Sequence, residues 1–139
     1  MKKIYSLILF LTIICTGTAI GMETDRFVEN FMTCTPYTER NSSQMFGMQV
    51  DSALEVLGFR GGLCGFRSTI NTPSGSAKIE CNFTEEQIME LISAMENNRS
   101  EIETFAQQGL DSNPNIDSNP AVVIFNKYFT DSSVCSVTN

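Results

Sequence analysis

Apolar and polar residues alternate along the middle of the chain, which predicts β-structure from residue 44 to residue 83. The clearest strand covers residues 77–83, where every second residue is apolar and the residues between them are polar: Ala77, Ile79, Cys81 and Phe83 alternate with Lys78, Glu80 and Asn82. Such a strand has one buried face and one face in water.

The rest of this region predicts two or three further strands. Residues 63–70 follow the turn residues Arg60, Gly61 and Gly62, and residues 71–76 have the composition of a loop. Residues 46–50 alternate and residues 54–59 form a second apolar segment, which fits one bent strand or two short ones. We therefore expect an antiparallel sheet of three or four strands.

A helix is expected before the sheet. Thr24 is a suitable N-cap, and the apolar residues Phe27, Val28, Phe31 and Met32 recur on one helical face. The helix should end near Cys34, because Pro36 disfavours helical geometry at the residue before it. Residues 37–44 are polar, and we expect a loop there.

The strongest local signal is a capping box at Thr84, which is followed three residues later by Gln87. An apolar stripe follows it, made of Ile88, Leu91, Ile92 and Met95. Two interpretations remain open: one helix through residue 108, or a first helix that breaks near Asn97 and Asn98 and a second that begins at Ser100.

The C-terminal part predicts a loop and then a further element. Residues 111–120 are rich in turn formers, and Asn119 with Pro120 forms a cap followed by a first-turn proline. A helix over residues 121–129 is expected, although Val122, Val123 and Ile124 would suit a strand equally well. The predicted fold class is α+β, with an N-terminal helix, the small antiparallel sheet and C-terminal helices packed on one face.

The first 21 residues have the pattern of a secretory signal peptide. A basic start is followed by an apolar run over residues 4–15 and by small residues up to Gly21. We expect residues 1–21 to be removed and residues 22–139 to form a single small disulfide-stabilised α+β domain; cleavage after Ala19 is nearly as suitable. The alternatives are an uncleaved anchor, for which the apolar run is barely long enough, and a lipid-modified Cys15, which Ile13 and Ile14 disfavour.

Four cysteines remain after the leader: Cys34, Cys64, Cys81 and Cys135. An even number in an exported chain predicts two disulfides, whose pairing the sequence leaves open. Bridges that tie helices to the sheet are favoured, and Cys64–Cys81 with Cys34–Cys135 is the alternative. A metal site is less favoured, because the chain has no CxxC pair and no histidine.

The net negative charge of the chain disfavours some classes of binding partner. The chain has nine basic and sixteen acidic side chains, and loss of Lys2 and Lys3 with the leader leaves seven basic ones and a net charge of −9. Such a chain should be repelled by nucleic acid and anionic lipid, although the charge also serves solubility. We expect a secreted or periplasmic protein without a nucleic-acid partner, which touches a membrane only through an uncleaved leader.

Enzymatic chemistry has few candidates. Without histidine the chain cannot build a Ser-His-Asp or Cys-His site, and no glycine-rich phosphate loop or cofactor motif is present. A carboxylate pair could use Glu80 with Glu85 or Glu86, but a solvated strand residue and acidic residues at a helix start explain these more simply.

A calcium site is a further candidate. Asp111, Asn113, Asn115 and Asp117 lie at alternate positions, as oxygen ligands do in a calcium loop. Ile116 and Val122 stand where the glycine and the bidentate glutamate belong, so a turn-rich linker explains the pattern more simply.

Three glycosylation sequons occur, at Asn41, Asn82 and Asn98, and they matter only in a eukaryotic secretory pathway. The Lys-Lys start favours a bacterial source. The segments at 34–37 (Cys-Thr-Pro-Tyr), 61–64 (Gly-Gly-Leu-Cys) and 81–87 (Cys-Asn-Phe-Thr-Glu-Glu-Gln) resemble short exported bacterial proteins, and this resemblance implies no activity.

These observations favour an exported, non-enzymatic module that binds another protein or an envelope component. The uncovered sheet face is the expected binding surface, with Arg67, Lys78, Glu80 and Asn82 as its candidate residues. The alternatives are a carboxylate-dependent hydrolase of glycan or cell wall and a calcium-stabilised surface protein.

Overall fold

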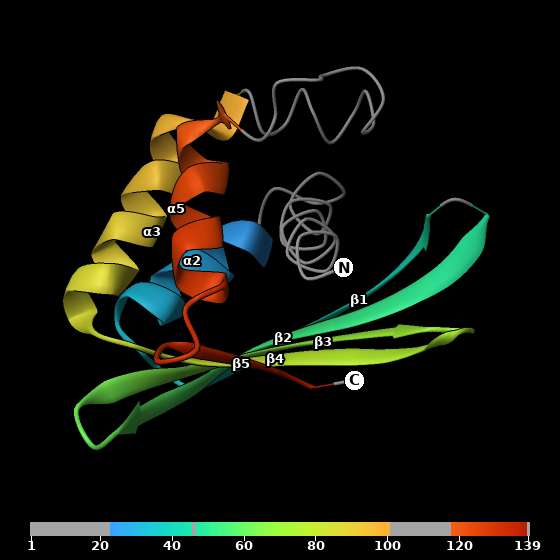
Figure 1. The fold of residues 1–139 in the computed structure, drawn as a ribbon, viewed down its shortest axis with the longest axis horizontal. Helices are drawn as coiled ribbons and strands as arrows, with labels where there is room; N and C mark the ends of the chain where they lie inside the picture. The colour runs from blue at the N-terminus through green and yellow to red at the C-terminus, as the bar shows by residue number, and fades with distance from the viewer. Residues whose placement is uncertain (1–22, 46, 101–117, 139) are drawn as a thin grey trace.

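Five antiparallel strands form one sheet in simple sequence order, and helices α2, α3 and α5 lie on one of its faces (Figure 1). The computed structural model describes residues 23–45, 47–100 and 118–138. In chain order the elements are α2 (Glu23–Met32), β1 (Tyr37–Met45), β2 (Met48–Arg60), β3 (Leu63–Thr72), β4 (Gly75–Phe83), α3 (Glu85–Asn97), α5 (Pro120–Phe129) and β5 (Cys135–Thr138). The α+β class and the antiparallel sheet are as the sequence predicted.

The expectation of three or four strands was wrong, because both edges of the sheet were missed. β1 occupies the polar segment expected to be a loop, and it pairs with β2 along its whole length, from Tyr37 opposite Val56 to Met45 opposite Met48. β5 pairs with β4 between Lys78 and Cys81. Edge strands can be polar because backbone pairing with a neighbour, rather than burial of side chains, holds them in place.

The turns between strands are tighter than the sequence indicated. Residues 48–50 and 54–59 belong to one long strand, β2, with a bulge between Val56 and Gly58, so the single bent strand is confirmed over two short ones. The expected loop over residues 71–76 lies mostly in β3 and β4, which pair out to Thr72 and Gly75. The turn at Gly61 and Gly62 is where it was predicted, with both glycines at positive φ.

Helix α3 begins with the predicted capping box. The Thr84 hydroxyl accepts a hydrogen bond from the Gln87 backbone, and the Gln87 side chain accepts one from the Thr84 backbone. The helix ends at Asn97, where Asn98 is the C-cap, so the continuous helix through residue 108 is excluded. Residues 101–117 lie outside the described part of the chain.

Helix α5 resolves the ambiguity over residues 121–129 in favour of a helix. The Asn119 side chain accepts a hydrogen bond of 2.9 Å from the backbone of Ala121, and Pro120 occupies the first turn. The β-branched residues Val122 and Ile124 are therefore helical, because the cap and the proline preset the first turn and the apolar face is buried. Val122 is 2 % exposed.

Aromatic rings fill the layer between the helices and the sheet. Phe66 on β3 lies 6.2 Å from Phe27, 5.7 Å from Phe31 and 6.5 Å from Phe129, measured between ring centroids. Phe83 contacts Phe31 and Tyr128 in edge-to-face geometry. One ring cluster thus joins α2 and α5 to β3 and β4.

Two disulfides reinforce this layer: the first ties a helix to the sheet, as favoured, whereas the second joins two neighbouring strands, and the alternative pairing is wrong. Cys34–Cys64 ties the end of α2 to β3, and Cys81–Cys135 joins β4 to the start of β5, directly after α5. All four cysteines are buried.

Candidate functional site

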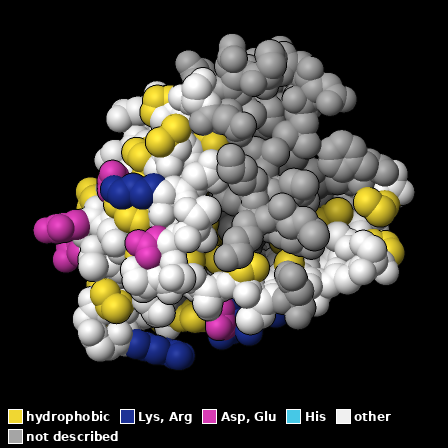
Figure 2. Space-filling model, in the orientation of Figure 1, with side chains coloured by type: hydrophobic (Ala, Val, Ile, Leu, Met, Phe, Trp, Pro, Cys, Tyr) yellow, Lys and Arg dark blue, Asp and Glu magenta, His cyan; other side chains and the backbone are white. Residues whose placement is uncertain are grey.

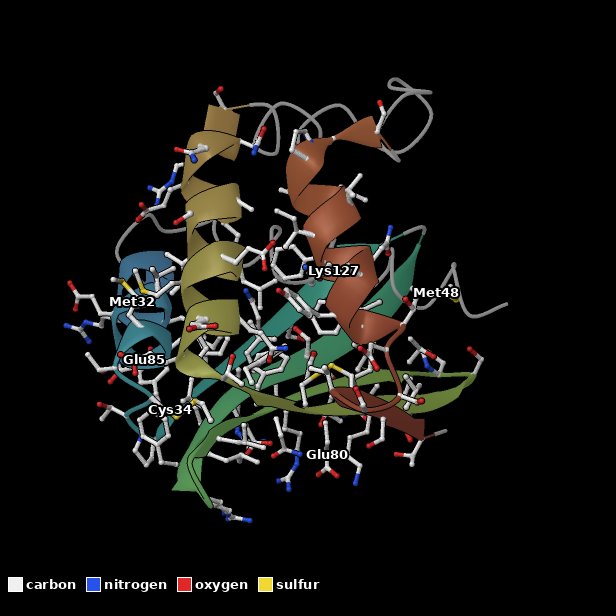
Figure 3. All side chains as sticks on the ribbon, turned by 60° about the vertical axis from the view of Figure 1, so that its left-hand side comes forward. Met32, Cys34, Met48, Glu80, Glu85 and Lys127 are labelled. Carbon is white, nitrogen blue, oxygen red and sulfur yellow. A yellow bond between two sulfur atoms is a disulfide. The ribbon has the colours of Figure 1, made fainter. Side chains whose placement is uncertain are left out.

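The sheet face opposite the helices carries the predicted binding residues. Side chains alternate between the two faces: Phe66, Ser68, Ile79 and Cys81 point to the helices and are buried. The residues between them form what we call the outer face, and its central members are Glu55, Arg67, Thr69, Lys78, Glu80 and Asn82. Figure 3 shows Glu80 on the side of the sheet away from the helices.

A row of alternating charges crosses the middle of the outer face. The strand register places Arg67 opposite Glu55 on β2 and opposite Glu80 on β4. The Arg67 Nε atom donates to Glu80 Oε1 at 2.7 Å, and Arg67 Nη1 lies 3.5 Å from Glu55 Oε2. Lys78 Nζ lies 3.6 Å from Glu80 Oε1. We call Glu55, Arg67, Glu80 and Lys78 the charge row.

Arg67 and Glu80, at the centre of the charge row, are each stabilised in the charged form. The hydrogen bond from Arg67, supported by Lys78, lowers the pKa of the Glu80 carboxyl below its ordinary value. The same hydrogen bond raises the pKa of Arg67. The side chains keep 23–43 % of their surface exposed, so their charges are available to a partner and are also screened by salt.

Asn82 lies beyond the charge row on the same face. It is exposed and sits opposite Gly65 on β3. A side chain at position 65 would collide with Leu57, whose Cβ would lie 3.0 Å from an added Cβ. The residue opposite Asn82 on β3 therefore contributes no side chain to the outer face.

The sequence missed one member of the row, Glu55. It is the second carboxylate that contacts Arg67, after Glu80, but only the β2–β3 register brings it there. Two polar residues on the inner face were missed as well: Glu39 is 7 % exposed and Ser68 is fully buried. Glu39 lies in β1, where a loop was expected, and the alternation of β3 could have identified Ser68 as inward-facing.

The carboxylates proposed for hydrolysis do not come together. Figure 3 shows Glu80 below the sheet and Glu85 on α3 above it, so the sheet separates them. Glu80 is also engaged by two cations and has a lowered pKa, which is the opposite of what a general acid needs. Glu85 and Glu86 lie in the first turn of α3, where they complement the helix dipole.

A cavity of about 20 Å³ lies between the described helices and the sheet, lined by apolar side chains such as Phe27, Phe66, Leu91 and Phe129. Ligand pockets are commonly about 300–1,000 Å³. This cavity is a packing defect of roughly one water's size rather than a binding site.

The described residues contain no group of three or more His, Cys, Asp or Glu side chains that could hold a metal ion. The calcium candidates Asp111, Asn113, Asn115 and Asp117 lie outside the described part. Within 23–45, 47–100 and 118–138, no helix is long and apolar enough to cross a membrane.

The three sequons differ in their surroundings. Asn82 is exposed on the outer face, and Asn41 is half-buried in β1. The Asn98 side chain donates to the Ala94 carbonyl oxygen at 2.8 Å, so its amide group is hydrogen-bonded to the end of α3.

Comparison with known proteins adds no family to this description. No protein-family model matches the chain, and neither a curated protein nor a solved structure is significantly similar to it.

Proposed function

We propose that the protein is an exported, non-enzymatic binding module that recognises a protein or an envelope component through its outer face. The observation that carries this proposal is the charge row on a sheet face that none of the described helices covers. Figure 2 shows acidic and basic side chains side by side on another face, without a large patch of one sign, so charge alone does not single out that surface.

The order of charges allows the outer face to distinguish one binding partner from another. Neighbouring strands are about 4.8 Å apart, so the row presents negative, positive and negative groups at a fixed spacing. A partner that carries the complementary order of charges gains binding energy, whereas a partner that places like charges opposite the charge row loses it. Arg67 is the expected anchor, because its guanidinium is planar and arginine is enriched among residues that dominate binding energy.

Export supports the same proposal. The two disulfides are typical of an oxidising compartment outside the cytosol. We propose that residues 1–21 are the leader that takes the chain there. Intact mass of the protein recovered from its host tests this: we expect a chain that begins at Met22 and lacks four hydrogens, and a full-length chain with four alkylatable thiols would contradict it.

Charge reversal tests the binding surface. The oxidised protein is immobilised and exposed to the envelope and secreted fractions of its host, and captured proteins and glycans are identified by mass spectrometry. We expect Arg67→Glu and Lys78→Glu to lose a partner that the unaltered protein retains. Arg60→Glu, at the exposed β2–β3 turn, makes the same charge change away from the charge row and should keep it.

The controls decide between lost binding and lost folding. Each variant must unfold at a urea concentration close to that of the parent before its binding is compared. The proposal is wrong if nothing is retained above background, or if all three variants retain the same partner equally.

A further inference from the structure

Among the described strands, β1 forms the longer open edge of the sheet, and it lacks several of the features that usually protect such an edge. β1 is nine residues long and lies at the end of the strand order, so within the described sheet only its β2 side is paired. Its register with β2 is uninterrupted, and it contains neither proline nor lysine. Natural edges are usually shortened, bulged or given prolines and lysines to prevent pairing with another chain.

The opposite edge of the sheet differs in its length and in its covalent attachment. β5 has four residues and covers β4 only between Lys78 and Cys81. It is also fixed to β4 by the Cys81–Cys135 disulfide. The long backbone edge available for pairing is therefore that of β1.

We infer that β1 pairs antiparallel with β1 of a second copy of this chain around a two-fold axis at Asn41, which joins two five-stranded sheets into one. A continuous sheet requires paired residues to face the same side, so the register can shift only in steps that preserve the faces. Asn41 is the midpoint of β1, and this register pairs all nine residues, from Tyr37 opposite Met45 to Met45 opposite Tyr37.

Charge selects this register over its neighbours. Centred on Asn41, the strand places Arg40 opposite Ser42 and Glu39 opposite Ser43, so no like charges meet. Moving the two-fold axis to residue 40 would place Arg40 opposite the second copy's Arg40, and moving it to residue 39 would place the two Glu39 residues opposite one another. Moving the axis to residue 42 would leave the first two residues of β1 unpaired.

The Asn41 register also brings opposite charges together across the new junction. Ser42 lies opposite Asp51 on β2, so the order of residues across the junction on the outer face is Asp51, Ser42 and then Arg40 of the second copy. Asp51 and that Arg40 would be two strand spacings apart, roughly 9–10 Å between Cα atoms. An arginine side chain can extend across the small Ser42 to the carboxylate, and the two-fold axis makes this contact twice.

The groups involved are suited to this contact. Arg40 and Asp51 are both exposed. The Asp51 carboxylate accepts hydrogen bonds from Ser42 and Gln49, which lower its pKa and keep it negatively charged. No described ion pair occupies Arg40 within one copy.

Sedimentation equilibrium of the oxidised exported protein tests the inference over a wide range of concentrations. We expect a monomer–dimer equilibrium that weakens as salt is raised. Arg40→Asp replaces each attraction to Asp51 across the junction by repulsion between two carboxylates, and it should raise the dimer dissociation constant by about tenfold or more. The double variant Arg40→Asp with Asp51→Arg restores opposite charges and should recover most of the affinity.

Arg60→Asp is the matched control, because it makes the same charge change at the β2–β3 turn and should leave the equilibrium unchanged. Hydrogen exchange should show amides of β1 becoming slower as concentration rises. The inference is overturned if the protein stays monomeric at millimolar concentration, if a dimer ignores Arg40→Asp, or if the double variant fails to recover it. Because the charge row is untouched in these variants, their failure would leave the proposed binding surface standing.

Discussion

At the scale of single residues, the end of α2 shows how a functional cysteine can override a conformational preference. The Thr35 amide donates to the Asn30 carbonyl and the Cys34 amide donates to the Phe31 carbonyl, which is the Schellman pattern. This pattern needs a left-handed residue, and Cys34 supplies it with φ of 51° although glycine is usual there. The disulfide to Cys64 explains why a cysteine is present instead.

Gly58 completes the same corner of the molecule. It lies at the β2 bulge with φ of 87°, and an added Cβ would lie 3.2 Å from Cγ of Pro36. The proline that ends the α2 connection therefore packs on a position where β2 has no side chain.

We predict that Gly58→Ala destabilises the protein more than Gly61→Ala does. Both glycines have positive φ, which costs an alanine about 1–2 kcal/mol, but only Gly58 has a neighbour within 4 Å. Crowding against Pro36 should add about 1–3 kcal/mol. Urea unfolding at pH 7 measures both variants, and equal losses would show that the Pro36 contact contributes nothing.

At the scale of elements, α3 and α5 are joined by a polar contact at the surface end of their apolar interface. The Tyr128 hydroxyl donates to Glu90 Oε2, and Lys127 Nζ lies 3.5 Å from Glu90 Oε1. Lys127 Nζ also lies 4.7 Å from the centre of the Tyr128 ring. The hydrogen bond from Tyr128 lowers the pKa of Glu90 and raises that of Tyr128.

We predict that Tyr128→Phe costs about 1 kcal/mol, because the buried ring keeps its packing and loses only the hydrogen bond. A double-mutant cycle with Glu90→Gln should show that the two losses are not additive. Additive losses in urea unfolding would mean that the two side chains act independently.

The disulfides belong to this scale too, since each joins elements distant in sequence. They close separations of 30 and 54 residues. Replacing both cysteines of a pair by alanine should lower the free energy of unfolding by about 3–4 kcal/mol, with the larger loss for Cys81 and Cys135. Guanidinium unfolding of each variant checks the order, and an unchanged midpoint after loss of either pair would contradict this role.

At the scale of the whole molecule, ionised carboxylates make the fold sensitive to acid. The pKa values of Asp51, Glu80, Glu90 and Asp131 are all lowered by hydrogen bonds made in the folded state. A lowered pKa contributes stability above the ordinary values of 3.8 for Asp and 4.5 for Glu, and this contribution is lost as the pH falls through the folded-state pKa.

We predict that Arg67→Met lowers the urea midpoint at pH 7. Between pH 5 and pH 3, however, this variant should lose less stability than the parent protein does. Without Arg67 the pKa of Glu80 returns toward its ordinary value, so less stability depends on its ionisation. Arg60→Met is the control and should follow the parent at every pH. Parallel curves for Arg67→Met and the parent would show that the Arg67–Glu80 pair does not contribute to acid sensitivity.

Much of this molecule was predictable because its signals are local. The Thr84 capping box, the Asn119–Pro120 start and the Gly61–Gly62 turn each depend on residues within a few positions of one another. Strict alternation in residues 77–83 likewise identified β4 and the outward direction of Lys78, Glu80 and Asn82.

Tertiary structure alone decided the rest. The polar segment Tyr37–Met45 becomes a strand only because β2 provides a pairing partner, and Glu55 joins the charge row only through the β2–β3 register. Cysteine pairing was likewise open until the elements were placed, since disulfide formation depends on distance in space. The chain itself specified caps, turns and the buried side of its strands, because these follow from neighbouring residues; edge strands, register and cross-links follow from contacts between segments far apart along the chain.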